Sequence, residues 1–101
     1  MSLQSYYRRI TAEMISEYET MGAWTDESMG DLLDAAVAQY ANKVALVDTR
    51  HRTTFREFGQ ITDSLVLSLH DLGLAAGDVV GLQAGNQSEY HFVRYALAKL
   101  G

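Results

Sequence analysis

Apolar residues recur at spacings of three and four in four parts of the chain, and this pattern predicts four amphipathic helices. The expected helices cover residues 5–22, 28–40, 55–72 and a stretch that follows Asn86. The first presents Tyr7, Ile10, Met14, Tyr18 and Met21 on one face. We expect this face to pack on the body of its own protein. A helix lying on a membrane surface is disfavoured, because the polar part carries glutamates where such helices carry lysine and arginine.

The other three helices have equally clear apolar faces. These are Met29, Leu32, Leu33, Ala36, Val37 and Tyr40; then Phe58, Ile61, Leu65, Leu69 and Leu72; and finally Tyr90, Val93, Leu97 and Leu100. Three pairs predict N-terminal caps: Ser28 with Asp31, Thr54 with Glu57, and Asn86 with Glu89. Gly22 and Gly73 are suited to end the helices before them.

Short apolar runs between the helices predict strands. Residues 44–47 suit a buried strand, residues 48–51 a polar turn, and residues 52–55 a return strand. A further strand is expected over residues 79–84, after a turn at 74–78. A strand, a crossover helix and another strand imply a parallel βαβ unit with a right-handed connection. The predicted fold class is therefore α/β.

Composition narrows the class of protein. A chain of 101 residues with 48% apolar and 21% charged residues fits one small globular domain, which would bury roughly 65% of its unfolded surface. The net charge is −5 and no large basic cluster occurs, so a nucleic-acid partner is disfavoured. No apolar run approaches the roughly 20 residues of a membrane-spanning helix. The absence of cysteine fits a cytoplasmic location.

Residue patterns for catalysis or ligand binding give no candidate site. No phosphate-binding loop of the P-loop type occurs, and Gly81 and Gly85 suit turns and close packing. The histidines at 51, 70 and 91 are too far apart in sequence to suggest a metal site. Ser88 and His91 share a helix face, but no nucleophile-elbow motif surrounds the serine. Acidic pairs such as Glu13/Glu17 and Asp31/Asp34 suit solvated helix faces. We therefore expect no catalytic, cofactor-binding or metal-ligating residue in this chain.

An ordered series of short motifs from Asp31 to Gly101 resembles the N-terminus of AMP-forming adenylating enzymes. This superfamily holds acyl- and aryl-CoA synthetases, nonribosomal-peptide adenylation domains and luciferases. The series comprises Lys43 to Asp48, Thr54-Phe55-Arg56-Glu57-Phe58, Leu72-Gly73-Leu74, Gly77 to Leu82, Asn86 to Tyr90 and Ala98-Lys99-Leu100-Gly101. Ala41, Ala76 and Gly85 stand where relatives often have proline. Residues 22–29 also resemble the lead-in of aryl- and alicyclic-acid ligases.

The resemblance implies an incomplete N-terminal part of a large adenylation domain, with helices and a partial, mostly parallel sheet. It divides the chain into an N-terminal helix and lead-in loop (1–27) and the first α/β portion of the domain (28–101). The whole enzyme would activate an acyl, aryl or alicyclic acid with ATP and Mg²⁺ through an acyl-adenylate, then usually acylate CoA. The family's catalytic loop ends in Pro-Lys-Gly, and this chain has no proline. No functional residue carries over, and we expect no activity from the 101 residues alone.

Other interpretations stay open at this point. The chain could be a small standalone α/β interaction domain that shares the order of elements; a divergent small enzyme has no candidate residues to support it. The identity of the acid is not readable, nor whether CoA or a carrier-protein thiol is the acceptor. We also expect the isolated chain to self-associate, because strands with open edges and half-covered apolar helix faces favour pairing between chains.

Overall fold

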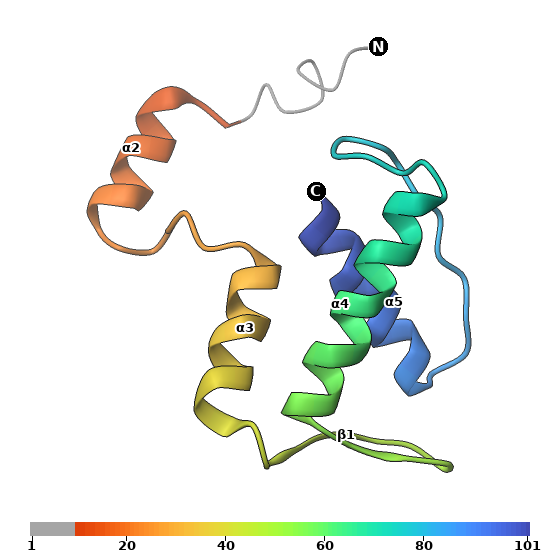
Figure 1. Ribbon diagram of the computed structural model, residues 1–101. Coiled ribbons are helices and arrows are strands. Elements are labelled where there is room, and N and C mark those ends of the chain that lie inside the picture. Colours follow the sequence, from red (N-terminus) through yellow and green to blue (C-terminus); the bar gives the residue numbers. More distant parts are fainter. Residues whose placement is uncertain (1–9) are drawn as a thin grey trace.

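The computed structural model describes residues 10–101, in which four helices accompany one two-stranded hairpin (Figure 1). The elements are α2 (Ala12–Thr20), α3 (Met29–Tyr40), β1 (Val44–Val47), β2 (Arg52–Thr54), α4 (Phe55–Asp71) and α5 (Ser88–Leu100). Helices α4 and α5 lie against each other, α3 packs beside both, and the hairpin connects α3 to α4. Helix α2 stands apart from this bundle (Figure 1). No helix among the described residues is long and apolar enough to cross a membrane.

The core lies where the three bundled helices meet. Leu33 of α3, Phe58 of α4 and Phe92 of α5 are buried together. The ring of Phe58 makes edge-to-face contacts with Phe92 and Tyr95, at centroid distances of 5.5 and 5.3 Å. Such contacts stabilise an aromatic pair beyond the area that it buries. A small aromatic cluster therefore holds α4 and α5 together.

Small residues allow α3 to approach its neighbours closely. A Cβ atom added at Gly59 of α4 would lie 2.9 Å from a methyl group of Val37, and one added at Gly30 would lie 2.8 Å from Cγ of Lys99. The stem of Lys99, from α5, packs on Gly30. Its ammonium Nζ bridges the other two helices, at 2.6 Å from Asp34 of α3 and 2.7 Å from Asp63 of α4. The contact of α3 with α4 thus depends on the missing side chain of Gly59, and its contact with α5 on that of Gly30.

The predicted start of the second helix is confirmed in detail. Ser28 Oγ accepts a hydrogen bond from the amide of Asp31 at 3.1 Å, and Asp31 Oδ2 accepts one from the amide of Ser28 at 2.9 Å. At α4, Thr54 Oγ1 accepts a hydrogen bond from the amide of Glu57 at 3.2 Å. The Glu57 carboxylate accepts a hydrogen bond from the Thr54 hydroxyl at 2.9 Å and not from the Thr54 amide. Thr54, which is also the last residue of β2, therefore forms only half of the expected capping box.

Helix ends and the hairpin also follow the sequence-based predictions. Gly22 and Gly73 adopt positive φ angles of 77° and 98° just beyond α2 and α4, a conformation that glycine adopts without strain. Strands β1 and β2 pair in the antiparallel sense. However, β1 is half-exposed rather than buried, with 62% of Val47 accessible.

The predicted parallel βαβ unit is wrong for the described part of the chain. Its only sheet is the β1–β2 hairpin, and residues 79–84 form an extended segment without a strand partner. A strand exists only with a hydrogen-bonded neighbour, and no described segment lies alongside residues 79–84 in pairing geometry. The molecule is therefore a helix-rich α/β fold with a small sheet, as expected of part of an adenylation domain.

The predicted first helix is shorter and less covered than expected. Residues 5–9, including Tyr7, lie outside the described part, and α2 has no buried residue. Ile10, Met14, Tyr18 and Met21 are 36 to 63% exposed. Among the described aromatic residues, Tyr18 meets a local neighbour, Trp24, with ring centroids 6.1 Å apart. This face does not pack on the described bundle, because the loop after Gly22 directs α2 away from it (Figure 1). Packing on another part of the protein stays a prediction.

The expected helix faces are partly shifted. On α5 the buried residues are Ser88, Phe92 and Ala96, while the predicted stripe of Tyr90, Val93, Leu97 and Leu100 is half-buried. On α4, Phe58 is buried as expected, but Gly59 and Thr62 accompany it and Leu72 is 80% exposed. A search for large apolar residues misses the small ones that allow helices to approach closely.

The chain also buries less surface than its length predicts. Its accessible surface is 7894 Å², against about 5,700 Å² for a folded monomer of this mass. Only about half of the unfolded surface is therefore buried, rather than roughly 65%. The radius of gyration, 16.4 Å, exceeds the value of about 13 Å typical of this chain length.

Candidate functional site

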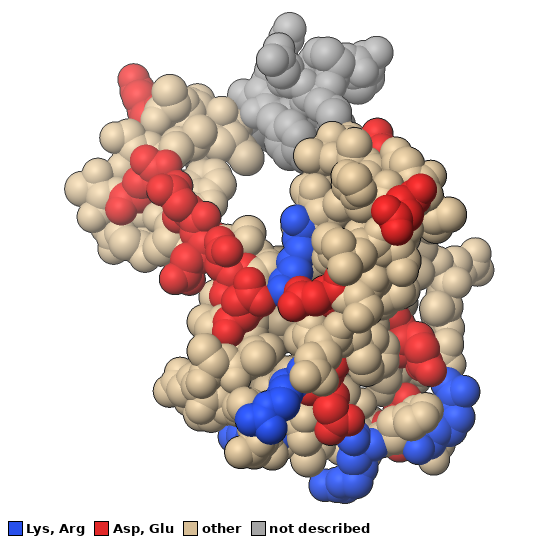
Figure 2. Space-filling model, in the orientation of Figure 1, with Lys and Arg blue, Asp and Glu red and all other residues tan. Residues whose placement is uncertain are grey.

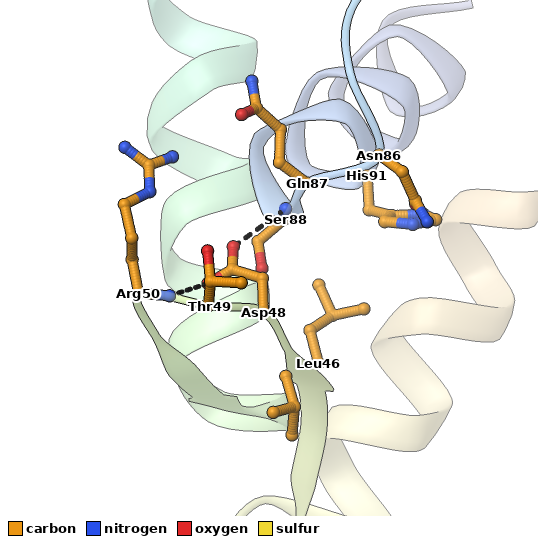
Figure 3. Close-up of a pocket in the computed structure, with 9 residues that line it drawn as sticks. Leu46, Asp48, Thr49, Arg50, Asn86, Gln87, Ser88 and His91 are labelled. Atoms are coloured by element: carbon orange, nitrogen blue, oxygen red, sulfur yellow. Dashed lines mark hydrogen bonds between the residues drawn. The ribbon is translucent and has the colours of Figure 1, made fainter.

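A polar pocket of about 260 Å³ lies between the hairpin turn and the start of α5 (Figure 3). Its lining residues are Leu46, Val47, Asp48, Thr49, Arg50, Asn86, Gln87, Ser88 and His91. The first five come from β1 and the turn that follows it, and the other four come from the first turn of α5 and the two residues before it. The pocket therefore joins parts of the chain that are about forty positions apart in the sequence.

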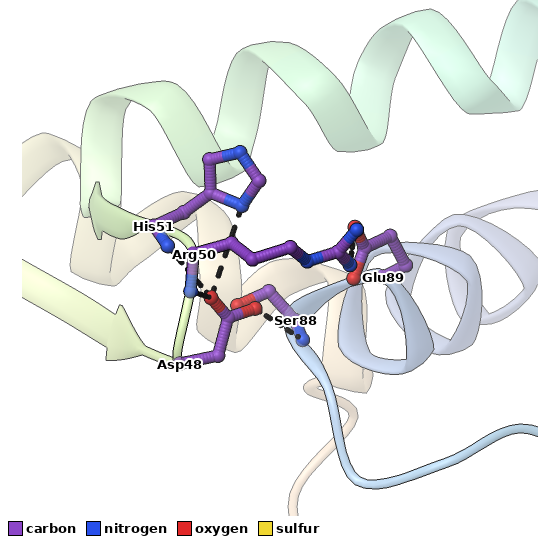
Figure 4. Close-up of polar contacts among 5 residues, drawn as sticks. All are labelled: Asp48, Arg50, His51, Ser88 and Glu89. Carbon is purple, nitrogen blue, oxygen red and sulfur yellow. Dashed lines mark hydrogen bonds and ion pairs between the residues drawn. The ribbon is translucent and has the colours of Figure 1, made fainter.

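The carboxylate of Asp48 organises this pocket (Figure 4). Oδ1 accepts hydrogen bonds from the amides of Arg50 at 2.9 Å and His51 at 2.7 Å. Oδ2 accepts from the amide of Ser88 at 3.1 Å. The pKa of Asp48 lies far below its usual range, chiefly because of the Ser88 hydroxyl, and further because of the amides of Arg50, Ser88 and His51. Hydrogen bonds to the charged form favour it.

Asp48 also caps α5. The N-cap residue of this helix, Gln87, makes no side-chain capping bond. The predicted cap by Asn86 is therefore wrong, and Asp48 supplies the carboxylate that accepts from the helix N-terminus, in addition to Glu89 in the first turn. A carboxylate in this position also interacts favourably with the helix dipole. No local sequence signal could have revealed a cap supplied from so far away.

Two further side chains reinforce the contact between the turn and α5. Arg50 forms an ion pair with Glu89 at 2.8 Å, and both side chains are about half exposed. His51 Nδ1 lies 3.8 Å from Asp48 Oδ1, and the contact is an ion pair only when the imidazole is protonated. We call Asp48, Arg50, His51, Ser88 and Glu89 the Asp48 junction (Figure 4).

The Asp48 junction does not fit the phosphates of ATP. The start of α5 is the kind of position where anions bind, but the carboxylate of Asp48 already lies there. The nearby guanidinium of Arg50 is paired with Glu89. Added phosphate would meet a negative charge instead of free donors. We therefore assign no nucleotide contact to this pocket.

Magnesium fits no better. Both oxygens of Asp48 accept backbone amides, and the described residues contain no group of three potential metal ligands. We accordingly assign no step that involves ATP or Mg²⁺ to these residues. The arrangement connects the hairpin to α5, which is a structural task.

The histidines and other polar residues considered in the sequence lie in separate surroundings. His91 lines the pocket, His51 belongs to the Asp48 junction, and His70 lies in the last turn of α4. Ser88 is buried in the first turn of α5. A Cβ atom added at Gly81 or Gly85 would meet nothing within 4 Å, so close packing does not explain these glycines.

Two of the acidic residues that were expected to lie on solvated helix faces form specific contacts. Asp31 caps α3, and hydrogen bonds with Ser28 lower its pKa. Asp34 pairs with Lys99 across the bundle, although its side chain is 64% exposed. Asp31 and Asp34 thus have specific partners in addition to solvent, and for Asp31 this is the cap that the sequence predicted. The pairing of Lys99 with α3 could not be found from sequence alone, because Lys99 and Asp34 lie 65 positions apart.

Comparison with known proteins assigns the family. The model of the AMP-binding enzyme family matches residues 33–101. This chain belongs to that family, whose members include adenylating enzymes, and it resembles their N-terminal portion. The predicted resemblance, based on the order of motifs between Asp31 and Gly101, is thereby confirmed.

Individual relatives point in the same direction. Enterobactin synthase component E from Escherichia coli is 30% identical over 95 residues, which cover 94% of this chain and 17% of that protein. The 2,3-dihydroxybenzoate-AMP ligase from Bacillus subtilis is 32% identical over 89 residues, which cover 88% of this chain and 16% of that protein. The apo structure of Mycobacterium smegmatis MbtA has a TM-score of 0.88 and 27% identity, covering 91% of this chain and 18% of that one. The chain thus spans about one sixth of the length of these relatives.

Proposed function

We propose that this chain is the N-terminal scaffold of an AMP-forming ligase that activates an aryl carboxylate as its acyl-adenylate. The observation that carries the proposal is the match of residues 33–101 to the AMP-binding family, together with the close similarity in fold to MbtA. Several relatives are named for aryl acids, among them two 2,3-dihydroxybenzoate-AMP ligases and a salicyl-AMP ligase. An aryl acid is therefore favoured over the broader class of acyl and alicyclic acids.

Within such an enzyme the described residues would act as scaffold. The bundle of α3, α4 and α5 supplies a buried aromatic core, and the Asp48 junction fixes the hairpin to α5. ATP, Mg²⁺ and the acid would be held by other parts of the enzyme. We further propose that the activated acyl group passes to CoA in the cytoplasm; a relative named as an acyl-CoA ligase, sidI from Beauveria bassiana, supports this acceptor.

ATP–pyrophosphate exchange tests the first half-reaction. The natural protein that contains this chain is assayed with 2,3-dihydroxybenzoate, salicylate, cyclohexanecarboxylate, acetate and no acid. We expect exchange that depends on an aryl acid. Absence of exchange with every acid would contradict adenylation, whereas exchange only with acetate or the alicyclic acid would contradict the aryl assignment.

The acceptor requires a separate measurement. With the preferred acid and ATP, mass spectrometry of the products should reveal an acyl-CoA thioester. Acylation of a carrier-protein thiol in the absence of any acyl-CoA would show that the CoA assignment is wrong while leaving adenylation intact. The name of one relative, salicyl-S-ArCP synthetase, makes this the natural comparison.

A further inference from the structure

We draw no further inference here: the strongest candidate, the exposed apolar face of α2 with the acidic side chains gathered over α2 and α3 (Figure 2), carries nothing because nothing in the structure shows what covers it.

Discussion

Asp48 connects two backbone segments, and each of its carboxylate oxygens has a defined hydrogen-bonding task. One oxygen orders the hairpin turn and the other caps α5. A side chain that satisfies several amides is hard to replace, because its loss leaves donors without acceptors. Stability at the residue scale should therefore depend more on Asp48 than on the acidic residues of the exposed surface.

Asp48→Ala should lower the free energy of unfolding at neutral pH, as measured by urea denaturation. The sign of the pH dependence follows from the depressed pKa of Asp48. A carboxyl with a lower pKa in the folded state stabilises the protein above its ordinary pKa of 3.8, and this contribution is lost as the pH falls toward the folded-state pKa. The difference between wild type and variant should shrink below that ordinary value.

Asp26→Ala is the matched control, because Asp26 lies exposed in the loop before α3. It should change the free energy of unfolding much less than Asp48→Ala does. Equal effects of the two substitutions, or a difference that grows in acid, would contradict the role assigned to Asp48.

Gly59→Ala tests the close approach of α3 and α4. In an exposed helix this substitution would stabilise by about 1 kcal/mol, but here the new methyl group would lie 2.9 Å from Val37. We expect a net loss of about 1–3 kcal/mol, the usual cost of overpacking. Urea denaturation of the Gly59→Ala and Val37→Ala variants, alone and combined, should show that the double variant loses less than the sum of the single changes.

Gly85→Ala serves as the control, since its added Cβ meets nothing within 4 Å. Its free energy of unfolding should stay within about 0.5 kcal/mol of wild type. Additivity of the Gly59 and Val37 substitutions would show that the two side chains do not compete for the same space.

At the scale of the helices, the ammonium group of Lys99 connects α3, α4 and α5. Lys99 extends from α5, its stem passes over Gly30 of α3, and its ammonium reaches Asp34 and Asp63. The Lys99 side chain is only 12% exposed, whereas its partners are largely accessible. Burial lowers the pKa of Lys99, but the two aspartates outweigh this effect and the pKa is raised overall. The ammonium is therefore charged when it bridges the helices.

Lys99→Met keeps the apolar stem and removes the charge. We expect a loss of about 1 kcal/mol at low salt, near the upper end for ion pairs with exposed partners. The loss should become smaller at high ionic strength, because salt screens such pairs. Arg50→Met is the control: it removes an ion pair exposed on both sides and should cost less. A larger loss at high salt would contradict an electrostatic role for Lys99.

The sequence predicts the elements well where the signal is local. The apolar periods place α3 and α4, the Ser28–Asp31 pair forms the expected cap, and Gly73 ends its helix as expected. Contacts between distant parts have no such signal. The cap of α5 by Asp48 and the bridge from Lys99 to α3 depend on tertiary folding. The strand predicted at 79–84 fails for the same reason, since a strand requires a neighbour that local pattern cannot supply.

At the scale of the whole molecule, the described chain is a packed three-helix bundle with an unusually large exposed surface. Its family membership follows from sequence order, because the ordered motifs between Asp31 and Gly101 lie in nearly the same stretch as residues 33–101, which the family model matches. The separation of residues 1–27 from 28–101 as two parts stays a prediction. In contrast, composition could not predict that the accessible surface is larger than that of a typical folded monomer of this mass.

Urea denaturation of the chain, at a concentration where sedimentation shows a monomer, tests this excess of exposed surface. The m-value is proportional to the surface exposed on unfolding. Because the chain buries about half of its unfolded surface, we expect an m-value about one fifth below that of compact domains of equal length. An m-value typical of a compact domain would show that the monomer buries more surface in solution than the structure indicates.

The hydrogen bond from Ser88 to Asp48 also has a kinetic consequence. It closes a loop of forty residues, and closing a long loop carries an entropic cost that must be met before the contact contributes. The first turn of α5 should therefore form late in folding, after the hairpin exists. Stopped-flow measurements of Asp48→Ala should show most of the lost stability as faster unfolding, from the late contact with Ser88, and a smaller part as slower refolding, from the turn contacts with Arg50 and His51.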